Sequence, residues 1–251
     1  MKLSYFDLLS PEPMNLSGIG GVISPKLKNI ASIGIYNYQY YLNFLSTDLK
    51  PRFYPSDMQM PEEFLSGRDN SLPDAFDLFI SNKSNSELMC NIFNFFIKED
   101  VVFSPQNKCF LAYSDNKVTG RIDKENYPKL CELILKRCGI NQEHEELDMS
   151  KAKNQKTLEI MQKLQKGREE NSKHPSSDKN MDLGNLISAI ANKSSSLNIL
   201  NIWDLTIFQL FDCFSRLSYN TIYEIGATNA AVWGTKDSSF DTLSWYKNLS
   251  Q

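Results

Sequence analysis

The feature that most constrains the fold is a strongly charged segment that separates two sections richer in apolar residues. Residues 141–180 begin with an acidic patch, continue with a lysine-rich stretch and carry only a thin stripe of apolar side chains. We expect a solvated helix followed by a disordered tether, because such a segment can bury little apolar surface. The sequence therefore predicts an N-terminal α+β domain at 1–140, a charged helical and disordered connector at 141–180, and a helical, aromatic-rich section at 181–251.

The first helix predicted in the N-terminal domain follows an irregular segment. Prolines and glycines make residues 10–23 a bending stretch without regular structure. Ser24 and Pro25 then suit an N-cap and the first helical position, and apolar residues at helical spacing continue to about Ser46. Gly34 lies inside this helix, where it suggests a close packing contact.

Two further helices are predicted before the connector. Residues 86–98 are apolar on more than one side, which indicates a buried helix. Asp123 suits the cap of a helix at about 124–138, and Gly139 suits the position just after its end. Residues 74–80 form an apolar island that fits either a strand or a helical turn.

Between these helices the apolar pattern changes from helical spacing to short runs divided by turns. Residues 101–119 contain three such runs, separated by a Pro-Gln-Asn turn and an Asp-Asn turn. This arrangement is typical of a small antiparallel meander.

The C-terminal section is predicted to be helical. A short helix begins near Asp182, and residues 203–217 form a helix with a continuous, wide apolar face that should be buried on both sides. The residues beyond this helix read as a weakly structured, aromatic tail. The predicted class is therefore an α+β fold that is mainly helical.

Composition favours a globular protein of the cytoplasm. The 251 residues are 41% hydrophobic and 23% charged, with a net charge of −3, so a basic surface for nucleic acid is not expected. No apolar run approaches the length that spans a bilayer, and an acidic residue comes too early for a signal peptide. Five cysteines without a CxxC pair are expected to stay reduced.

The sequence offers little for catalysis, cofactor binding or metal binding. His144 and His174 both fall in the charged connector, where a rigid catalytic imidazole is not expected. Residues 18–21 are glycine-rich but lack the Lys-Ser/Thr of a phosphate-binding loop. We therefore predict a non-catalytic protein without cofactor or metal that binds other proteins. The sequence leaves its oligomeric state open.

The aromatic residues of the C-terminal section have two interpretations. Those of the predicted helix are expected to pack in the core. Trp233, Trp245 and Tyr246 lie where regular structure is weak, and aromatic side chains are enriched at interfaces, so these three are the candidate partner-binding residues.

Three stretches carry a resemblance to a known class of proteins. They are residues 3–11 (LSYFDLLSP) with Gly21 and the Ser24-Pro25 pair, residues 200–212 (LNIWDLTIFQLFD) with Phe214, Arg216 and Leu217, and the closing AVWG and WYKN at 231–234 and 245–248. Together they resemble structural-module proteins of tailed bacteriophages and of prophages of Gram-positive bacteria. The likeness covers roughly the first 50 and the last 70 residues.

The resemblance implies a tail assembly chaperone in the cytoplasm of a bacterial host. Its partner would be the tape measure protein or another tail protein, and no catalytic residue is implied. A chaperone of this kind would offer grooves that bury the apolar stripe of a helical client. A minor component of the tail or neck, a host-directed inhibitor or regulator, and a hydrolase are the alternatives.

Overall fold

The computed structural model describes residues 3–46, 75–140, 182–234 and 240–247. Within these ranges the chain forms eight α-helices and two small antiparallel sheets, one of two strands and one of three. The predicted class, a mainly helical α+β fold with a small antiparallel meander, is confirmed. The predicted connector at 141–180 lies outside the described residues, so its helix and tether stay predictions.

The helices and strands follow one another with short connections on each side of the residues that are not described. Up to residue 140 they are α1 (Tyr5–Leu9), β1 (Met14–Leu16), β2 (Gly20–Val22), α2 (Leu27–Ile33), α3 (Ile35–Ser46), α5 (Ala75–Phe79), α6 (Lys83–Phe96), β3 (Asp100–Ser104), β4 (Cys109–Ser114), β5 (Lys117–Ile122) and α7 (Tyr127–Arg137). After residue 181 they are α9 (Leu183–Lys193), the 3₁₀ helix η3 (Ile202–Asp204), α10 (Ile207–Trp233) and the 3₁₀ helix η5 (Ser244–Tyr246).

Residues 10–23 form a hairpin, β1 and β2, rather than the irregular segment predicted. The loop of this hairpin packs on the three-stranded sheet, where the amide of Arg121 donates to the carbonyl of Gly18 at 2.8 Å and Ile19 is buried. A β-carbon at Gly120 would come within 1.9 Å of the Ile19 carbonyl oxygen, so only glycine allows this approach. The glycine-rich turn therefore serves to pack the hairpin closely against the three-stranded sheet.

The single helix predicted from Ser24 to Ser46 is divided into α2 and α3 at Gly34. Gly34 has φ 83 and ψ 148, a conformation that residues with a β-carbon disfavour. A β-carbon added at Gly34 would have open space around it. The sequence suggested that Gly34 allows close packing. In the structure it instead lets the backbone turn between α2 and α3. The cap is also displaced, because Lys26 is the N-cap and Ser24 Oγ instead donates to the carbonyl of Arg137 at 2.8 Å.

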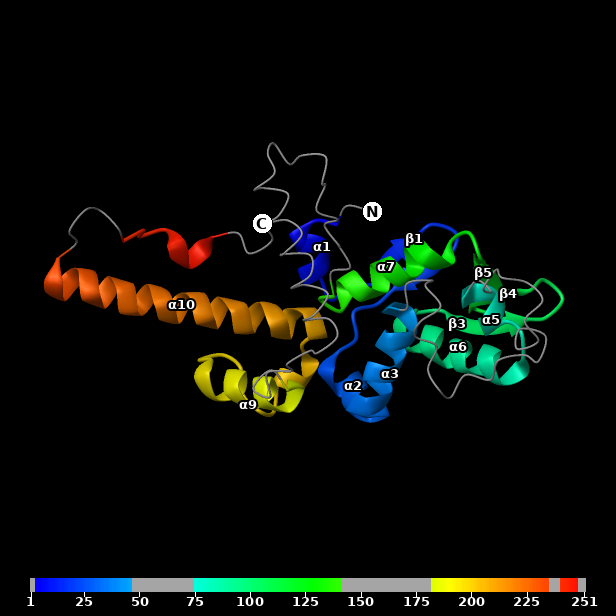
Figure 1. The fold of residues 1–251 in the computed structure, drawn as a ribbon, viewed down its shortest axis with the longest axis horizontal. Coiled ribbons are helices and arrows are strands. Elements are labelled where there is room, and N and C mark those ends of the chain that lie inside the picture. The colour runs from blue at the N-terminus through cyan, green and yellow to red at the C-terminus, as the bar shows by residue number, and fades with distance from the viewer. Residues whose placement is uncertain (1–2, 47–74, 141–181, 235–239, 248–251) are drawn as a thin grey trace, which may run out of the picture.

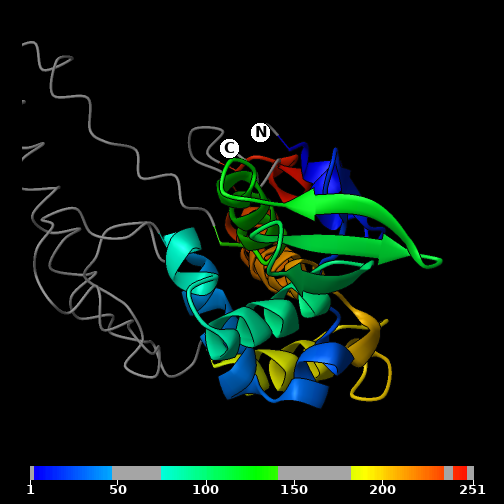
Figure 2. The ribbon, with the colours of Figure 1, turned by 90° about the vertical axis from the view of Figure 1, so that its right-hand side faces the viewer.

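The predicted meander is present as the sheet β3-β4-β5, with all neighbours antiparallel. Asp115 and Asn116 both have positive φ, which matches the two-residue turn that joins β4 to β5. The sheet packs on α6 (Figure 2), and the side chain of Asn94 in α6 both donates to and accepts from the backbone of Val101. This contact satisfies backbone groups on the outer side of the edge strand β3.

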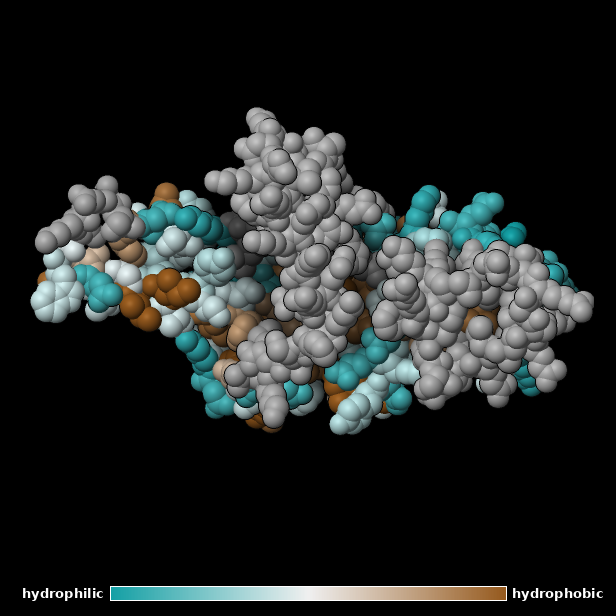
Figure 3. Space-filling model, in the orientation of Figure 1, coloured by the Kyte–Doolittle hydropathy of each residue, from teal (hydrophilic) through white to brown (hydrophobic). Residues whose placement is uncertain are grey.

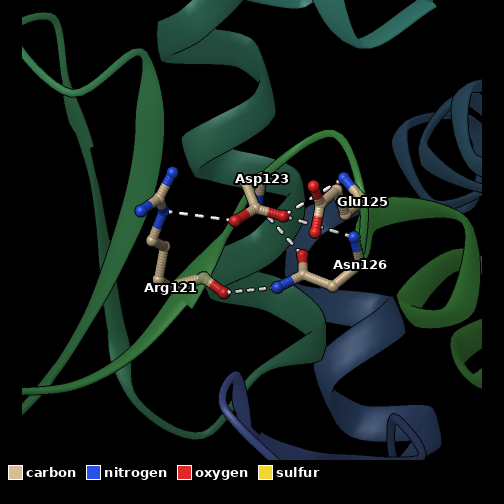
Figure 4. Close-up of polar contacts among 4 residues, drawn as sticks. All are labelled: Arg121, Asp123, Glu125 and Asn126. Atoms are coloured by element: carbon tan, nitrogen blue, oxygen red, sulfur yellow. Dashed lines mark hydrogen bonds and ion pairs between the residues drawn. The ribbon is translucent and has the colours of Figure 1, made fainter.

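The described part of the apolar island at 74–80 is helical, since it forms α5. The helix predicted at 124–138 begins three residues later, and its N-cap is Asn126 rather than Asp123. Figure 4 shows the reason: the carboxylate of Asp123 accepts from the amides of Glu125 and Asn126, and it also pairs with Arg121 at 3.2 Å. Asp123 thus shapes the turn before the helix.

The C-terminal section contains a much longer helix than predicted. The predicted helix at 203–217 begins instead at Ile207 and continues to Trp233, 27 residues in all, while Trp203 belongs to the preceding η3. Asp182 does cap α9, as expected, through the amides of Gly184 and Asn185. The predicted weakly structured tail therefore includes sixteen more residues of regular helix.

The described parts of the N-terminal and C-terminal sections share one hydrophobic core. Buried residues of α9 and α10, such as Leu186 and Leu210, belong to the same cluster as those of α6, α7 and the sheet. The backbones are also bonded, since Leu27 N donates to Leu205 O and Ile207 N donates to Pro25 O, both at 2.9 Å. The division into domains at 140 and 181 stays a prediction. Beyond this core, α10 extends away from the body (Figure 1).

Candidate partner-binding surface

The start of α10 is fixed to the body by its own capping residues. Thr206 and Gln209 cap each other's backbone amides, at 3.2 and 2.9 Å. The amide group of Gln209 also donates to the carbonyl of Leu9 at 2.9 Å, which joins the start of α10 to the end of α1.

A polar cluster holds α1 along the next turns of α10. The hydroxyl of Tyr5 donates to the carboxylate of Asp212, and Arg216 donates to the same hydroxyl at 3.5 Å. Burial and the bond to Asp212 raise the pKa of Tyr5, so its hydroxyl remains the donor at neutral pH. The ring of Tyr5 also meets that of Phe208 edge-on. The first part of α10 is therefore rigidly placed.

Another face of α10 is covered by α9. Leu186, Ile187 and Ile190 of α9 are buried there, and Lys193 at its end donates to Thr221 Oγ1 at 2.5 Å. Figure 1 shows that α9 accompanies only the part of α10 nearest the body. The outer part of α10 thus lacks this cover.

A third face carries residues 240–247, which lie back along α10. Phe240 stacks on Tyr223 with ring centroids 5.4 Å apart, and Arg216 donates to the carbonyl of Lys247 at 2.8 Å. Lys247 also pairs with Asp241 at 2.8 Å, which lowers the pKa of Asp241 and raises that of Lys247. These contacts place η5 on the surface of α10.

The remaining face of the outer part of α10 is apolar and exposed. Four large side chains have between 58% and 83% of their surface exposed: Ile222, Ile225, Val232 and Trp233. Figure 3 shows hydrophobic surface over this part of the molecule. Between Leu217 and Trp233 the only charged residue is Glu224. An exposed helix with so few charges is typical of a surface that is covered by a partner.

The structure brings together two of the three predicted partner-binding residues. Trp245 and Tyr246 both lie in η5, each about half exposed, with ring centroids 5.0 Å apart. Trp233 is strongly exposed at the far end of α10, 17 residues beyond the Arg216 that holds this segment, roughly 25 Å along the helix axis. It therefore belongs with the exposed side chains of α10 rather than with the pair in η5.

Three exposed residues escaped the sequence prediction, namely Ile222, Ile225 and Val232. The sequence does show a nearly uncharged run from 217 to 233, which could have indicated an exposed apolar surface. These residues share a face only because the helix continues beyond Leu217, which was not predicted. The aromatic residues predicted to pack in the core are partly buried, and Trp203, Phe211 and Phe214 contact it.

Two cysteines of the described residues, Cys131 and Cys138, are buried in the core. Burial raises the pKa of Cys131 and of Cys138 to about 12, so both thiols stay protonated at neutral pH. In the described ranges no three His, Cys, Asp or Glu residues are grouped as a metal site would require. His144 and His174 lie outside these ranges. None of the helices described is long and apolar enough to cross a membrane.

A comparison with known protein families matches the section that carries this surface. Residues 172–250 match the family described as YomV second domain, a name taken from a Bacillus prophage-type protein. No curated protein and no solved structure matches the chain. The section that contains α9, α10 and η5 is therefore similar to a phage-related family.

Proposed function

We propose that the chain is a non-catalytic protein-binding factor encoded by a phage or prophage. In this proposal its C-terminal section binds an apolar helix of another phage protein. The observation that carries it is the pair Trp245 and Tyr246, two adjacent aromatic side chains held at the surface of α10. The similarity of residues 172–250 to the YomV second domain supports a phage-related role for the same section.

The physical reason for binding lies in the exposure of these side chains to water. Burying a large aromatic side chain at an interface is favourable, and Trp and Tyr are the residues that contribute most at such sites. The segment that presents them is anchored at both ends, by Phe240 on Tyr223 and by Lys247 on Arg216. Little conformational entropy is then lost when a partner docks.

The more specific proposal is a tail assembly chaperone whose client is the tape measure protein. It is supported by the resemblance of the N-terminal and C-terminal stretches to structural-module proteins of tailed bacteriophages and prophages. A long helix with an apolar stripe needs cover before the tail assembles around it, and an exposed aromatic pair offers such cover.

The test is co-expression with the tape measure protein of the same phage genome, followed by purification and titration. We expect the two proteins to purify together. Replacing Trp245 and Tyr246 together by alanine should weaken the affinity about tenfold or more, because truncation of interface aromatics commonly costs more than 1.4 kcal/mol. The matched control is Tyr36→Ala, which removes an exposed aromatic of α3 far from η5 in the chain.

Equal binding by the wild type and the Trp245→Ala/Tyr246→Ala variant would contradict the role of this surface. Mass spectrometry of finished particles separates the chaperone from a structural component, since a chaperone is absent from them. Recovery of a host enzyme in place of tail proteins would favour a host-directed inhibitor.

A further inference from the structure

The exposed face of α10 is a second surface, distinct from the pair in η5. It begins where α9 ends beside Thr221 and continues to Trp233. Beside this face, α10 is covered by residues 240–247, with Phe240 against Tyr223 and Gly226. We name the exposed side chains of this face, Ile222, Ile225, Val232 and Trp233, the α10 stripe.

The spacing of the α10 stripe suits pairing with another helix. Ile222, Ile225, Asn229 and Val232 follow one another at intervals of three, four and three residues, so they lie along one side of the helix. This is the spacing of the contact positions in paired helices. Asn229 is the polar residue of the row, and a single polar residue at such a position is used to fix the register of a pair.

The charges around the stripe favour a second copy of the chain as the occupant. Glu224, the only charged residue from 217 to 233, is three residues from Thr221 and so lies toward the α9 side. A stripe without charge meets no like charge when it faces itself, and it buries no charge.

The area of the stripe meets the lower limit for a specific pair of copies. Its four side chains expose on the order of 500 Å² in each copy, so that two copies would bury on the order of 1,000 Å², the lower bound for a specific interface.

We infer that two copies associate through their α10 stripes in a symmetric, antiparallel pair. The direction follows from the inner end of the same face, where Phe211 is covered by the end of α7. A β-carbon at Gly139 would lie 3.1 Å from the ring of Phe211, so a second helix cannot continue past this point. An antiparallel arrangement places the two bodies at opposite ends and pairs only the outer parts of α10. This dimer goes beyond the proposed function and would present two aromatic pairs to clients.

The experiment is sedimentation velocity on the full chain from micromolar to submillimolar concentration. We expect a reversible dimer, a monomer for the variant Ile222→Glu/Ile225→Glu, and a dimer for the control Leu200→Glu, which changes an exposed leucine outside the stripe. Circular dichroism checks that each variant keeps its helix content. A wild type that stays monomeric throughout, or a control that dissociates as well, would overturn the inference.

A second variant is expected to strengthen the dimer rather than weaken it. Because an unfolded protein would not form a tighter dimer, loss of folding cannot produce this result. Asn229→Leu replaces the polar residue of the row by an apolar one and should tighten the dimer by several-fold. Unchanged or weaker association would count against the pairing. If the wild type is a monomer and the Ile222→Glu/Ile225→Glu variant no longer binds the client, the dimer is overturned and the stripe is assigned to the client instead. The dimer can fail while the Trp245→Ala/Tyr246→Ala result holds, so the two proposals are separable.

Discussion

At the scale of single residues, the side chain of Arg137 ties the N-terminal segment to the end of α7. The side chain is fully buried, and its guanidinium donates to the carbonyls of Asp7, Ser10 and Glu12 at 2.9 to 3.1 Å. A buried cation is costly unless its donors are satisfied. Here three backbone oxygens accept from Nη1 and Nη2, whereas Nε is buried without a hydrogen-bond partner. Arg137 thereby positions the stretch after α1, the helix whose Tyr5 lies against α10.

Replacing Arg137 by methionine should lower the free energy of unfolding by about 3 kcal/mol, because three backbone carbonyls lose a charged donor. Urea denaturation measures the change. The control is Arg121→Met, which removes an exposed arginine paired with Asp123 and should cost less than about 1 kcal/mol. Equal destabilisation by both variants would show that Arg137 has no special role.

Residue-level prediction from the sequence succeeded where exposure is set locally and failed where it depends on packing. Trp245 and Tyr246 were predicted to bind a partner, which requires exposure, and both are exposed. The binding itself stays a prediction. Arg137 appears in the sequence as one more basic residue near the end of a helix, since nothing local shows that carbonyls from residues 7–12 surround it. Ile222 and Ile225 were missed because their exposure depends on where α9 ends.

At the scale of elements, the break between α2 and α3 rests on Gly34. Its backbone conformation is one that residues with a β-carbon rarely adopt. Replacing Gly34 by alanine should lower the free energy of unfolding by roughly 1–2 kcal/mol, since the strain exceeds the entropic gain from losing a glycine. Thermal or urea denaturation checks this value, with Ser32→Ala on the exposed side of α2 as the control. A stabilised variant would indicate that the two helices can merge into one.

The sequence predicted the presence of most elements but not where several of them begin and end. Helical spacing found α6, α7 and α9, and the turn residues located the three-stranded sheet. The outer half of α10 was missed because Asn220, Gly226 and Asn229 lower helix propensity. The contact of Tyr223 with Phe240 supports this half, and Phe240 comes later in the chain.

At the scale of the whole molecule, the shared core links the candidate surface to the rest of the chain. Leu210 of α10 is fully buried in the same cluster as Phe93 of α6, although 117 positions separate them in the sequence. Backbone hydrogen bonds between residues 25–27 and 205–207 add a direct connection. Long-range contacts of this kind leave no periodic signal, so the sequence could only suggest separate sections.

We expect the described sections to unfold as one cooperative unit. Leu210→Ala should lower the free energy of unfolding by about 3 kcal/mol, because it leaves a cavity in the common core. Hydrogen exchange should then show the loss of protection in α6 as well as in α10, by the same amount of free energy. Leu200→Ala, at an exposed position, should change neither. Protection that falls in α9 and α10 while α6 keeps its own would mean that the two sections are stable independently, and that the surface on α10 is carried by a separate domain.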